Sequence, residues 1–508
     1  MKRHSRQTAT KQGRPGLRQP ALSAEAVFAE ASRHHQAGYL DEAEHLYRQV
    51  LAIESRHADS LNRLGTIAWQ RGHHDRAIDL IGRAIAIDGE NASFHSTLGA
   101  VLDEQGRPDA AIASFCTALR LRPNYPEVLN DLGNVLLKQA RPEQAAACYR
   151  LALEITPDNP GAYSNLGKAL QEQGHPEEAF TCFQRAIALA PDLPDARHNR
   201  AMALLARGDM AAGWQEYEWR WRTPQMTRFR RDFPQPQWQG EAAPGQTLLI
   251  HAEQGFGDTL QFCRYASLAA ARGLRVIMEV QPPLLRLLRD LPDVDRVVAR
   301  GEELPQFDLH CPMLSLPFAL GTTLATIPGD TPYLHADATQ VVAWKARLAA
   351  TVGQRQRIGL VWAGNPRAHL AVGAALDRHR SIPPERLASL LDLPGRQFFS
   401  LQKDGPAAPA GLGLIDHMAE MKDFADTAAL VVALDMVISV DTAVAHLAAA
   451  LGRPVWLLDR FNPCWRWLLG RRDSPWYPTL RIYRQPRPGD WDAVLTEVAR
   501  DLGNLGQT

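Results

Sequence analysis

Asp441, Thr442 and His446 are three polar residues in an otherwise small and apolar stretch, ISVDTAVAHLAAALGRPVWLL at 438–458. The pattern is typical of a strand, a polar turn, a helix and a second strand. Such a turn gathers backbone N–H groups and the positive end of a helix dipole at one point, which suits an anion such as a diphosphate. An ordinary βαβ unit without a ligand has the same periodicity, so the hypothesis depends on the three polar residues.

Asp258 is a candidate general base. It follows an apolar run at 247–251 and a turn bracketed by Gly255 and Gly257, and helical periodicity continues over 258–271. An ionised carboxylate at the end of a strand can remove the proton of an attacking hydroxyl group. The alternative is that Asp258 only caps its helix.

The turn before Asp258 belongs to neither of two common nucleotide motifs. Gly255 and Gly257 permit close backbone approach to a ligand. However, Gly-Phe-Gly-Asp is not the dinucleotide fingerprint, and the chain has no GxxxxGK[ST] motif of a P-loop NTPase. If Asp258 is not the base, His251 and Glu253 are the substitutes that the sequence offers.

Further strands and helices are needed to position these candidates. Strand or helix patterns occur in order at 275–280, 293–298, 307–310, 341–350, 357–362, 397–401 and 423–434. Asn365 and Lys403 follow two of the predicted strands. Ligands of open α/β sheets lie outside the carboxyl ends of the strands, so both residues are expected to line a cleft between two Rossmann-like halves. Asp258 and Asp441 are expected in the same cleft.

A repeat of 34 residues governs the chain from residue 24 to residue 193. Leu-Gly recurs at 64–65, 98–99, 132–133 and 166–167, and alanine recurs at 43, 77, 111, 145 and 179, followed four residues later by Tyr47, Ile81, Phe115, Tyr149 and Phe183. Small residues let two helices approach closely, and the large residue fills the remaining space. The pattern predicts five helix pairs and a degenerate sixth, and it resembles the tetratricopeptide repeat.

Solenoids of this family present the first helix of each pair on a concave face that binds extended peptides. The polar side chains expected there are Asn62, Asn130, Asn134, Asn165, Lys168 and Asn199. Asparagine amides donate and accept hydrogen bonds, so they can hold a peptide backbone without reading its sequence. A solvated groove used for self-association is the alternative.

The segment 214–238 is rich in tryptophan, tyrosine, arginine and proline. Aromatics interleaved with arginine can bind single-stranded nucleic acid. We favour a cap, in which Trp214, Tyr217, Trp219 and Trp221 bury the last helix of the solenoid against the next domain. Pro224, Pro234 and Pro236 then predict an extended linker, which we place at 228–244.

Composition limits the function classes. The 508 residues contain 56 Lys plus Arg and 56 Asp plus Glu, so no global charge favours nucleic acid or a membrane. Six scattered cysteines without a CxxC pair argue against a metal ribbon or disulfide framework, and we interpret them as packing residues. Neither a membrane span nor a secretory signal is evident, which predicts a cytoplasmic protein. Residues 1–20 are basic and predict a disordered tail.

The motif at 440–447 is similar to the nucleotide-sugar motif of the bacterial heptosyltransferases, glycosyltransferase family nine. In that family Asp-[Ser/Thr]-Gly-x-x-His-Leu opens the helix that holds the donor diphosphate; Ala443 stands here in place of the glycine. The sequence GFGDTLQF resembles the family's Gly-Asp turn, and the resemblance assigns Gly257 to the donor site and the base to Asp258. Arg380 lies where the family has a basic phosphate contact before a proline.

The resemblance covers about residues 245–505 and implies a GT-B enzyme that uses a nucleotide-diphosphate sugar. The predicted order is a tail at 1–20, a solenoid at 21–227, a linker at 228–244, an acceptor subdomain at 245–340 and a nucleotide-sugar subdomain at 341–508. The repeats joined to a GT-B region also resemble the protein O-GlcNAc transferases of family forty-one. We therefore expect an inverting transferase with no metal or other cofactor, acting on a polypeptide or glycan bound through the repeats and not on nucleic acid.

Each site assignment has a structural alternative. Asp441 and Thr442 can simply cap a helix, His446 can be a satisfied interior histidine, and Arg380 and Lys403 can be solvated. The whole α/β half can also be a degenerate domain, which would make the chain a non-catalytic scaffold. If the repeats only bind the acceptor, deletion of 1–210 should spare slow hydrolysis of the donor.

Overall fold

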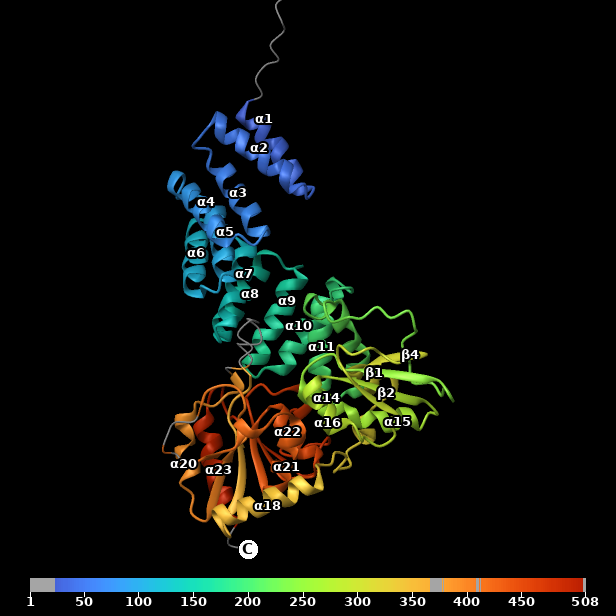
Figure 1. The fold of residues 1–508 in the computed structure, drawn as a ribbon. Helices are drawn as coiled ribbons and strands as arrows, with labels where there is room; N and C mark the ends of the chain where they lie inside the picture. Colours follow the sequence, from blue (N-terminus) through green and yellow to red (C-terminus); the bar gives the residue numbers. More distant parts are fainter. Residues whose placement is uncertain (1–22, 366–376, 378, 408–410, 412, 506–508) are drawn as a thin grey trace, which may run out of the picture. The chain divides into compact units, whose positions relative to one another are not determined.

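The computed structural model describes residues 23–365, 377, 379–407, 411 and 413–505 (Figure 1). The tail predicted at 1–20 lies outside the described residues. The chain divides into two compact units, Met1–Val135 and Leu136–Thr508. The division falls inside the repeats, within helix α7, and the candidate site lies wholly in the second unit.

The repeats form pairs of helices with the predicted period. The first unit contains α1 (Ala24–Gln36), α2 (Leu40–Ile53), α3 (Ala58–Gln70), α4 (His74–Ile87), α5 (Ala92–Glu104) and α6 (Pro108–Leu121). Helix α7 (Pro126–Lys138) crosses the division, and the second unit continues with α8 (Pro142–Ile155), α9 (Pro160–Glu172), α10 (Pro176–Leu189), α11 (Pro194–Arg207) and α12 (Met210–Tyr217). Five pairs and a sixth, shorter pair confirm the solenoid.

The glycines of three Leu-Gly pairs, Gly65, Gly99 and Gly167, lie where two helices touch. A Cβ atom at Gly65 would lie 2.6 Å from Ile81, and one at Gly99 would lie 2.7 Å from the ring of Phe115. Both large residues come from the predicted position four residues after the repeated alanine. The 34-residue pattern therefore reflects a steric requirement: glycine on one helix leaves room for the large side chain of the paired helix.

The aromatic cap predicted after the last repeat is present, although only part of it is buried. Trp214 and Tyr217 are buried, and the Trp214 ring lies 5.1 Å from that of Trp465 in the α/β region. Trp219 and Trp221 are half-buried. The 3-10 helix η1 (Glu218–Arg222) and the short α13 (Pro224–Thr227) follow, so Pro224 begins a helix and not an extended linker.

The first sheet has four parallel strands in the order β3-β2-β1-β4. Its strands are β1 (Thr247–His251), β2 (Arg275–Val280), β3 (Arg296–Ala299) and β4 (Leu309–Pro312). Its helices are α14 (Phe256–Phe262), η2 (Cys263–Tyr265), α15 (Ala266–Ala270), η3 (Pro282–Leu284), α16 (Leu285–Leu288), η4 (Met313–Ser315), α17 (Leu316–Ala319) and η5 (Leu324–Thr326). The expected helix at 258–271 is thus broken into three short helices, and the strands predicted at 293–298 and 307–310 begin later than expected.

The segment predicted as a linker is packed against this sheet. The Trp238 N–H donates to the His310 carbonyl of β4 at 2.8 Å, and the His310 N–H donates to the Pro236 carbonyl at 3.1 Å. Phe233 packs against Leu249 and Ile277 on the face of the sheet. The segment therefore supplies apolar cover as well as a connection.

The second sheet has six parallel strands in the order β10-β9-β8-β5-β6-β7. Its strands are β5 (Gln356–Val361), β6 (Arg396–Ser400), β7 (Ile415–Asp416), β8 (Met436–Val440), β9 (Val455–Asp459) and β10 (Leu480–Arg484). Its helices are α18 (Ala338–Val352), η6 (Pro384–Leu387), α20 (Ala388–Leu391), η7 (Met418–Glu420), α21 (Phe424–Ala433), α22 (Ala443–Ala450), η8 (Trp465–Trp467) and α23 (Trp491–Asn504). This order is that of a doubly wound sheet, in which ligands bind where the winding reverses, here between β5 and β8.

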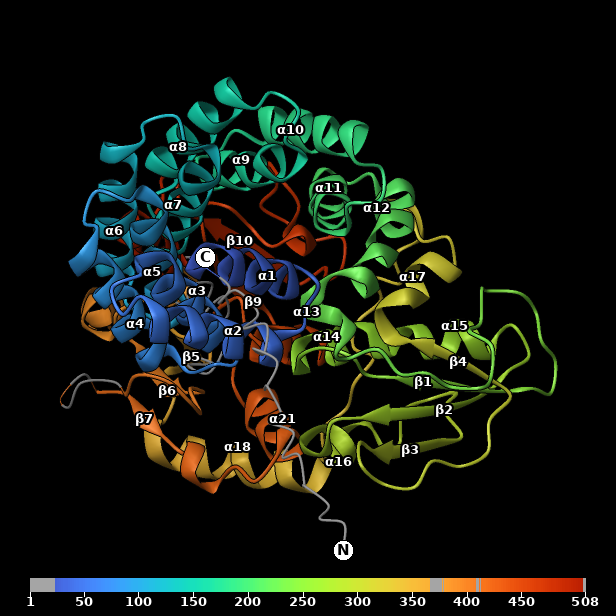
Figure 2. The same ribbon diagram turned by 90° about the horizontal axis from the view of Figure 1, so that it is seen from above.

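One apolar core connects the last repeat with both sheets. It includes Leu205 of α11, Trp214 of α12, Leu248 of β1 and Val437 of β8. Figure 2 shows α12 next to α17, the helix that follows β4 of the first sheet. Deletion of 1–210 would remove part of this core, so the structure does not support residue 210 as a boundary between the solenoid and an intact catalytic region. In the described part of the chain, no helix is both long and apolar enough to cross a membrane.

Gly99→Ala tests the close helix contact. The added methyl group has no room beside Phe115, so we expect the free energy of unfolding to fall by about 1–3 kcal/mol, as for other overpacked sites. Gly82, within α4, is the control because a Cβ atom there would meet nothing within 4 Å. Gly82→Ala should instead stabilise the protein by about 1 kcal/mol. Urea denaturation of both variants measures the difference; two stabilised variants would contradict the predicted contact.

Candidate functional site

Helices α14 and α22 meet at the carboxyl ends of the two sheets, which brings together two motifs far apart in the sequence (Figure 1). α14 follows β1, and α22 follows β8. A Cβ atom at Gly257 would lie 2.9 Å from Cδ2 of His446 and 3.6 Å from Cα of Ala443. The structure therefore places Gly257, Ala443 and His446 at one point, and glycine is required there by the close approach.

Asp258 lies in the first turn of α14, beside this contact. Its Oδ2 accepts the Gly255 N–H at 2.9 Å, so the helix-capping role is present. Its Oδ1 forms an ion pair with Arg466. Asp258 thus caps a helix and also carries a fixed negative charge at the junction of the two halves.

Arg466 is a site residue that sequence reasoning missed. It is almost fully buried, and its Nε donates to Oε1 of Gln261 at 2.7 Å. Its guanidinium also lies 4.3 Å from the ring centre of Trp465. Burial lowers the pKa of Arg466, but the combined effects of Asp258, Cys464 and Tyr217 outweigh burial and raise the pKa.

His446 is a buried, neutral histidine. Its Nδ1 is hydrogen-bonded to the Tyr477 hydroxyl at 2.9 Å, and its ring stacks on Trp467. Burial, reinforced by the charge of Arg466, lowers the pKa of His446 to about 3. These contacts fit the alternative of a satisfied interior histidine. They leave Nε2 facing Asp441, 4.0 Å from Oδ1.

Asp441 and Thr442 lie at the reversal point of the second sheet, directly after β8. Thr442 is the N-cap residue of α22, but its side chain makes no capping hydrogen bond. Its hydroxyl lies 3.0 Å from that of Ser439. The simple capping alternative is therefore wrong for Thr442, and the start of α22 is not closed by that side chain.

Arg380 is held against the same turn and is not a solvated surface residue. Its NH1 donates to the Asp441 carbonyl at 3.0 Å, and its guanidinium pairs with Asp377 at 3.0 Å. The backbone of Gly364, at the end of β5, packs so closely against Arg380 and Asp377 that a Cβ atom would collide with both. Arg380 thus joins the ends of β5 and β8.

Lys403 and Asn365 have other partners. The Lys403 ammonium donates to the Met421 carbonyl. The Asn365 amide donates to Oδ2 of Asp404 at 3.3 Å, at the exposed end of β5. Both follow strands of the second sheet, as predicted, but neither is in hydrogen-bond contact with the Asp258 and His446 group in the described structure.

Glu253 and His251, the two alternative bases, are engaged by other residues. Glu253 is 4% exposed and pairs with the buried Arg220 through two hydrogen bonds of 3.0 Å. His251 packs against His310 and Phe233, and burial lowers its pKa to about 3. Both side chains are buried, which leaves Asp258 as the candidate base.

A local signal could have identified the missed residues. The stretch CWRWLLGRRDSPWYP at 464–478 is as dense in aromatic residues and arginine as the cap at 214–238. It contributes Arg466, Trp467 and Tyr477, all buried around His446. Asp459, at the end of β9, was also missed. Burial, together with the charge of Asp441 and against the opposing effect of Arg484, raises the pKa of Asp459 to about 6.

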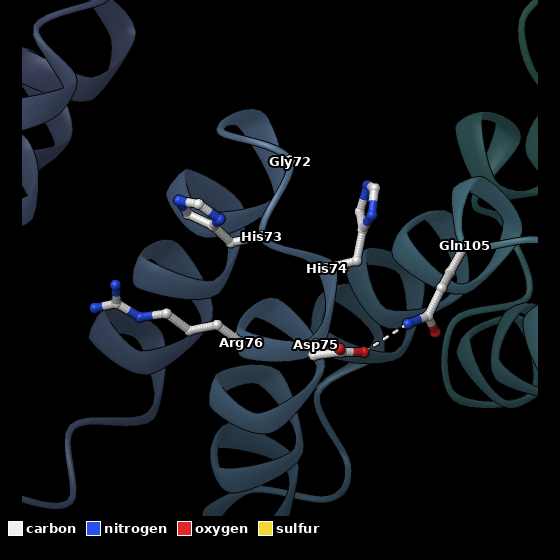
Figure 3. A pocket seen from close by; sticks show the side chains of 6 residues that line it. All are labelled: Gly72, His73, His74, Asp75, Arg76 and Gln105. Atoms are coloured by element: carbon white, nitrogen blue, oxygen red, sulfur yellow. Dashed lines mark hydrogen bonds between the residues drawn. The ribbon is translucent and has the colours of Figure 1, made fainter.

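The first unit has a surface hollow of its own, formed by other residues than this site. It has a volume of about 550 Å³ and is lined by Gly72, His73, His74, Asp75, Arg76 and Gln105 (Figure 3). The Gln105 amide donates to Oδ1 of Asp75 across it at 2.7 Å. In the described residues, no three His, Cys, Asp or Glu side chains are grouped as metal ligands.

The polar residues expected on the concave face differ in accessibility. Asn62 is buried, and the Asn199 amide donates to the Ser164 hydroxyl at 3.1 Å. Lys168 is exposed, and Asn130, Asn134 and Asn165 all have interaction partners in the protein. The predicted row of asparagines is thus partly used for contacts within the solenoid.

Family models match segments of the repeats and one segment of the α/β region. Residues 102–139 and 141–174 match a model described as TPR repeat, and residues 28–92 and 160–193 match models described as tetratricopeptide repeat. Residues 418–458 match glycosyltransferase family 9 (heptosyltransferase). The chain thus carries segments that match tetratricopeptide repeats and one segment that matches glycosyltransferase family 9. The segment that matches family 9 contains Asp441 and His446.

Related proteins match parts of the chain. Protein FlbA of Caulobacter vibrioides is 28% identical over 326 residues, which are 59% of this chain and 53% of FlbA. The chain therefore spans about half the length of this curated relative. The crystal structure of MamA is 22% identical and covers 33% of this chain and 92% of its own, with a TM-score of 0.30. A thermophilic TPR protein of Thermus thermophilus is 21% identical and covers 36% and 100%, with a TM-score of 0.31.

The neutral histidines predict acid sensitivity. His251 and His446 have pKa values of about 3 in the folded protein and of about 6.5 when unfolded, so only the unfolded chain takes up their protons below pH 6.5. Each histidine should therefore reduce the free energy of unfolding by about 1 kcal/mol between pH 7.5 and 5.5.

Melting temperatures at these two pH values measure the effect. The raised pKa of Asp459 has the opposite effect, because the folded protein takes up this one proton before the unfolded chain does. It therefore offsets part of the loss of stability that the two histidines cause. We expect a lower melting temperature at pH 5.5, and a smaller decrease in His251→Phe, which retains the ring but cannot bind a proton. A variant whose pH dependence equals that of the wild type would contradict the assignment of a neutral His251.

Proposed function

We propose that this protein is an inverting glycosyltransferase that transfers a sugar from a nucleotide-diphosphate donor without a metal ion. One observation carries the proposal: the junction of α14 and α22 places a carboxylate, Asp258, beside the start of the helix that belongs to the family 9 motif. A base and a diphosphate site on opposite sides of one cleft are the two requirements of an inverting transfer.

The donor diphosphate would bind at the start of α22. The N–H groups there are not capped by the Thr442 side chain, and the dipole of the helix favours negative charge. Arg380 lies against the Asp441 carbonyl and adds positive charge. Fixed N–H groups and a guanidinium can stabilise the leaving diphosphate, which is a role that a metal ion fills in other enzymes.

Asp258 would remove the proton of the acceptor hydroxyl as its oxygen attacks the anomeric carbon. The oxygen then bonds to the sugar, and the diphosphate leaves with the electrons of the broken bond. The neutral His446 would help to hold the donor: an N–H at Nε2 can donate to a phosphate oxygen when Nδ1 accepts from Tyr477. Ala443 replaces a glycine of the motif, but its small side chain still fits beside Gly257.

The repeats support a polypeptide or a glycan as the acceptor. Solenoids of this type bind extended chains, and their last pair here shares a core with the α/β region. We favour a polypeptide. The second candidate is a scaffold that binds a partner but no donor, because Ala443 departs from the motif and a βαβ unit can persist without activity.

Titration of the wild-type protein with UDP-, GDP- and ADP-sugars by calorimetry, in EDTA, separates these functions. We expect one nucleotide to bind and its sugar to be transferred or slowly hydrolysed in the presence of EDTA. Asp258→Asn keeps the cap but cannot accept a proton, so it should retain donor affinity and lower turnover by roughly 100-fold.

Asp490→Asn is the matched control. Asp490 caps α23 through the Ala493 N–H and pairs with Arg487, as Asp258 does with Gly255 and Arg466, but it lies on another element. Its variant should keep full turnover. If no nucleotide sugar binds the wild-type protein, the scaffold is the better assignment. If Asp258→Asn keeps most of its turnover, another group is the base.

A further inference from the structure

Arg466 joins the two halves of the site at the carboxylate of Asp258. It belongs to residues 460–469, which we call the bridging loop and which follow β9 of the second sheet. Its guanidinium contacts Asp258 and Gln261, both on α14 of the first sheet. A residue from one half therefore fixes the proposed base of the other half.

The bridging loop is held in turn by the end of helix α9. The Asn462 amide donates to Oε1 of Glu172 at 2.9 Å. Two residues after Glu172, Gly174 lies against the ring of Phe461, and a Cβ atom at Gly174 would be 2.5 Å from that ring. Gly174 has a φ of +81° and occupies the turn between α9 and α10. The loop thus rests on a repeat turn that offers no side chain at the contact.

The sixth helix pair holds the other side of the bridging loop. The Leu469 N–H donates to the Ala206 carbonyl of α11 at 2.8 Å. Trp465 packs edge-on against Trp214 of α12, with ring centres 5.1 Å apart, and the Arg466 guanidinium lies over the face of Trp465. Leu469 and Trp465 therefore connect the repeats to the part of the bridging loop that carries the Arg466 guanidinium.

The position of this guanidinium matters for a base. Asp258 accepts the Gly255 N–H through one oxygen and meets Arg466 through the other, so the carboxyl group cannot rotate freely. A general base must be aimed at the acceptor hydroxyl, and the contact with Arg466 fixes the direction of the carboxyl group.

We propose that Arg466 is a positioning residue for Asp258 and that repeats α9–α12 set its place through the bridging loop. The inference rests on the proposed role of Asp258 as the base. It assigns the last repeats to the catalytic unit itself, in addition to any role in binding the acceptor. Displacing the bridging loop from the repeat side should then impair catalysis without a change in any residue of the sheets.

Arg466→Gln tests the positioning role. The variant loses the ion pair that holds one oxygen of Asp258, so the carboxyl group is no longer fixed in one direction. We expect kcat to fall by about tenfold while KM for the donor stays at the wild-type value. Arg466→Lys keeps a positive charge beside Asp258 and should retain more of the turnover.

Arg471→Gln is the control for the loss of an arginine. Arg471 follows the bridging loop and pairs with Asp473 at the surface, so its variant should keep the wild-type kcat and KM. Melting temperatures report whether each variant is folded. A wild-type kcat in folded Arg466→Gln overturns the positioning role while the proposed function stands. A wild-type protein without any turnover overturns the proposed function and the positioning role with it.

Gly174→Ala tests the contribution of the repeats. The same turn position, 34 residues apart, holds Gly38, Gly72, Gly106, Ala140, Gly174 and Gly208. Ala140 adopts a φ of 58°, so this turn accepts alanine. At Gly174 the added methyl group meets Phe461, whereas at Gly106 it would meet nothing within 4 Å.

We expect Gly174→Ala to lower turnover by about tenfold, because small displacements of catalytic groups have large effects on rate. Gly106→Ala carries the same backbone strain and should retain wild-type turnover. Equal turnover in the two variants and the wild type would overturn the role of the repeats. A lower kcat in Arg466→Gln would in that case assign the positioning to Arg466 without the repeats.

Discussion

The candidate site depends on how closely α14 and α22 approach each other, and Gly257 sets that distance. A larger residue would push against His446, which cannot move because it is buried between Trp467 and Tyr477. The two helices belong to different sheets, so their contact fixes the relation between the proposed base and the proposed diphosphate site. A site divided between two sheets needs such a contact, because neither half contains both functions.

Buried charge pairs set the geometry around this contact. Arg220 and Glu253 join the end of the repeats to the first sheet, and Arg466 and Asp258 join the second sheet to the first. Burial of ion pairs adds little net stability, but removal of one partner leaves a buried charge without compensation and is costly. Such pairs therefore select one arrangement of the parts over its alternatives. In this protein both pairs converge on the segment from the end of β1 to the first turn of α14.

Much of the site follows from strand–turn–helix patterns that can be read locally. Asp258 and Asp441 were predicted at the carboxyl ends of strands, and β1 and α22 occur where the patterns place them. Lys403 also follows its predicted strand, yet it bonds to the Met421 carbonyl, because periodicity specifies where a side chain starts and not where it points. Arg466 was missed because its partner Asp258 lies 208 residues away. No local pattern relates two residues so far apart.

The sequence by itself determined the repeat, its helix pairs and the parallel strands, because these depend on periodic spacing of small and apolar residues along the chain. The spacing of Gly99 and Phe115 predicts a contact between two paired helices, and the structure contains this contact. Only the tertiary structure decided that His446 is buried and neutral, that Glu253 is engaged by Arg220, and that the last repeats hold the bridging loop. Burial and charge pairing arise between elements distant in sequence, so they exist only after the chain has folded.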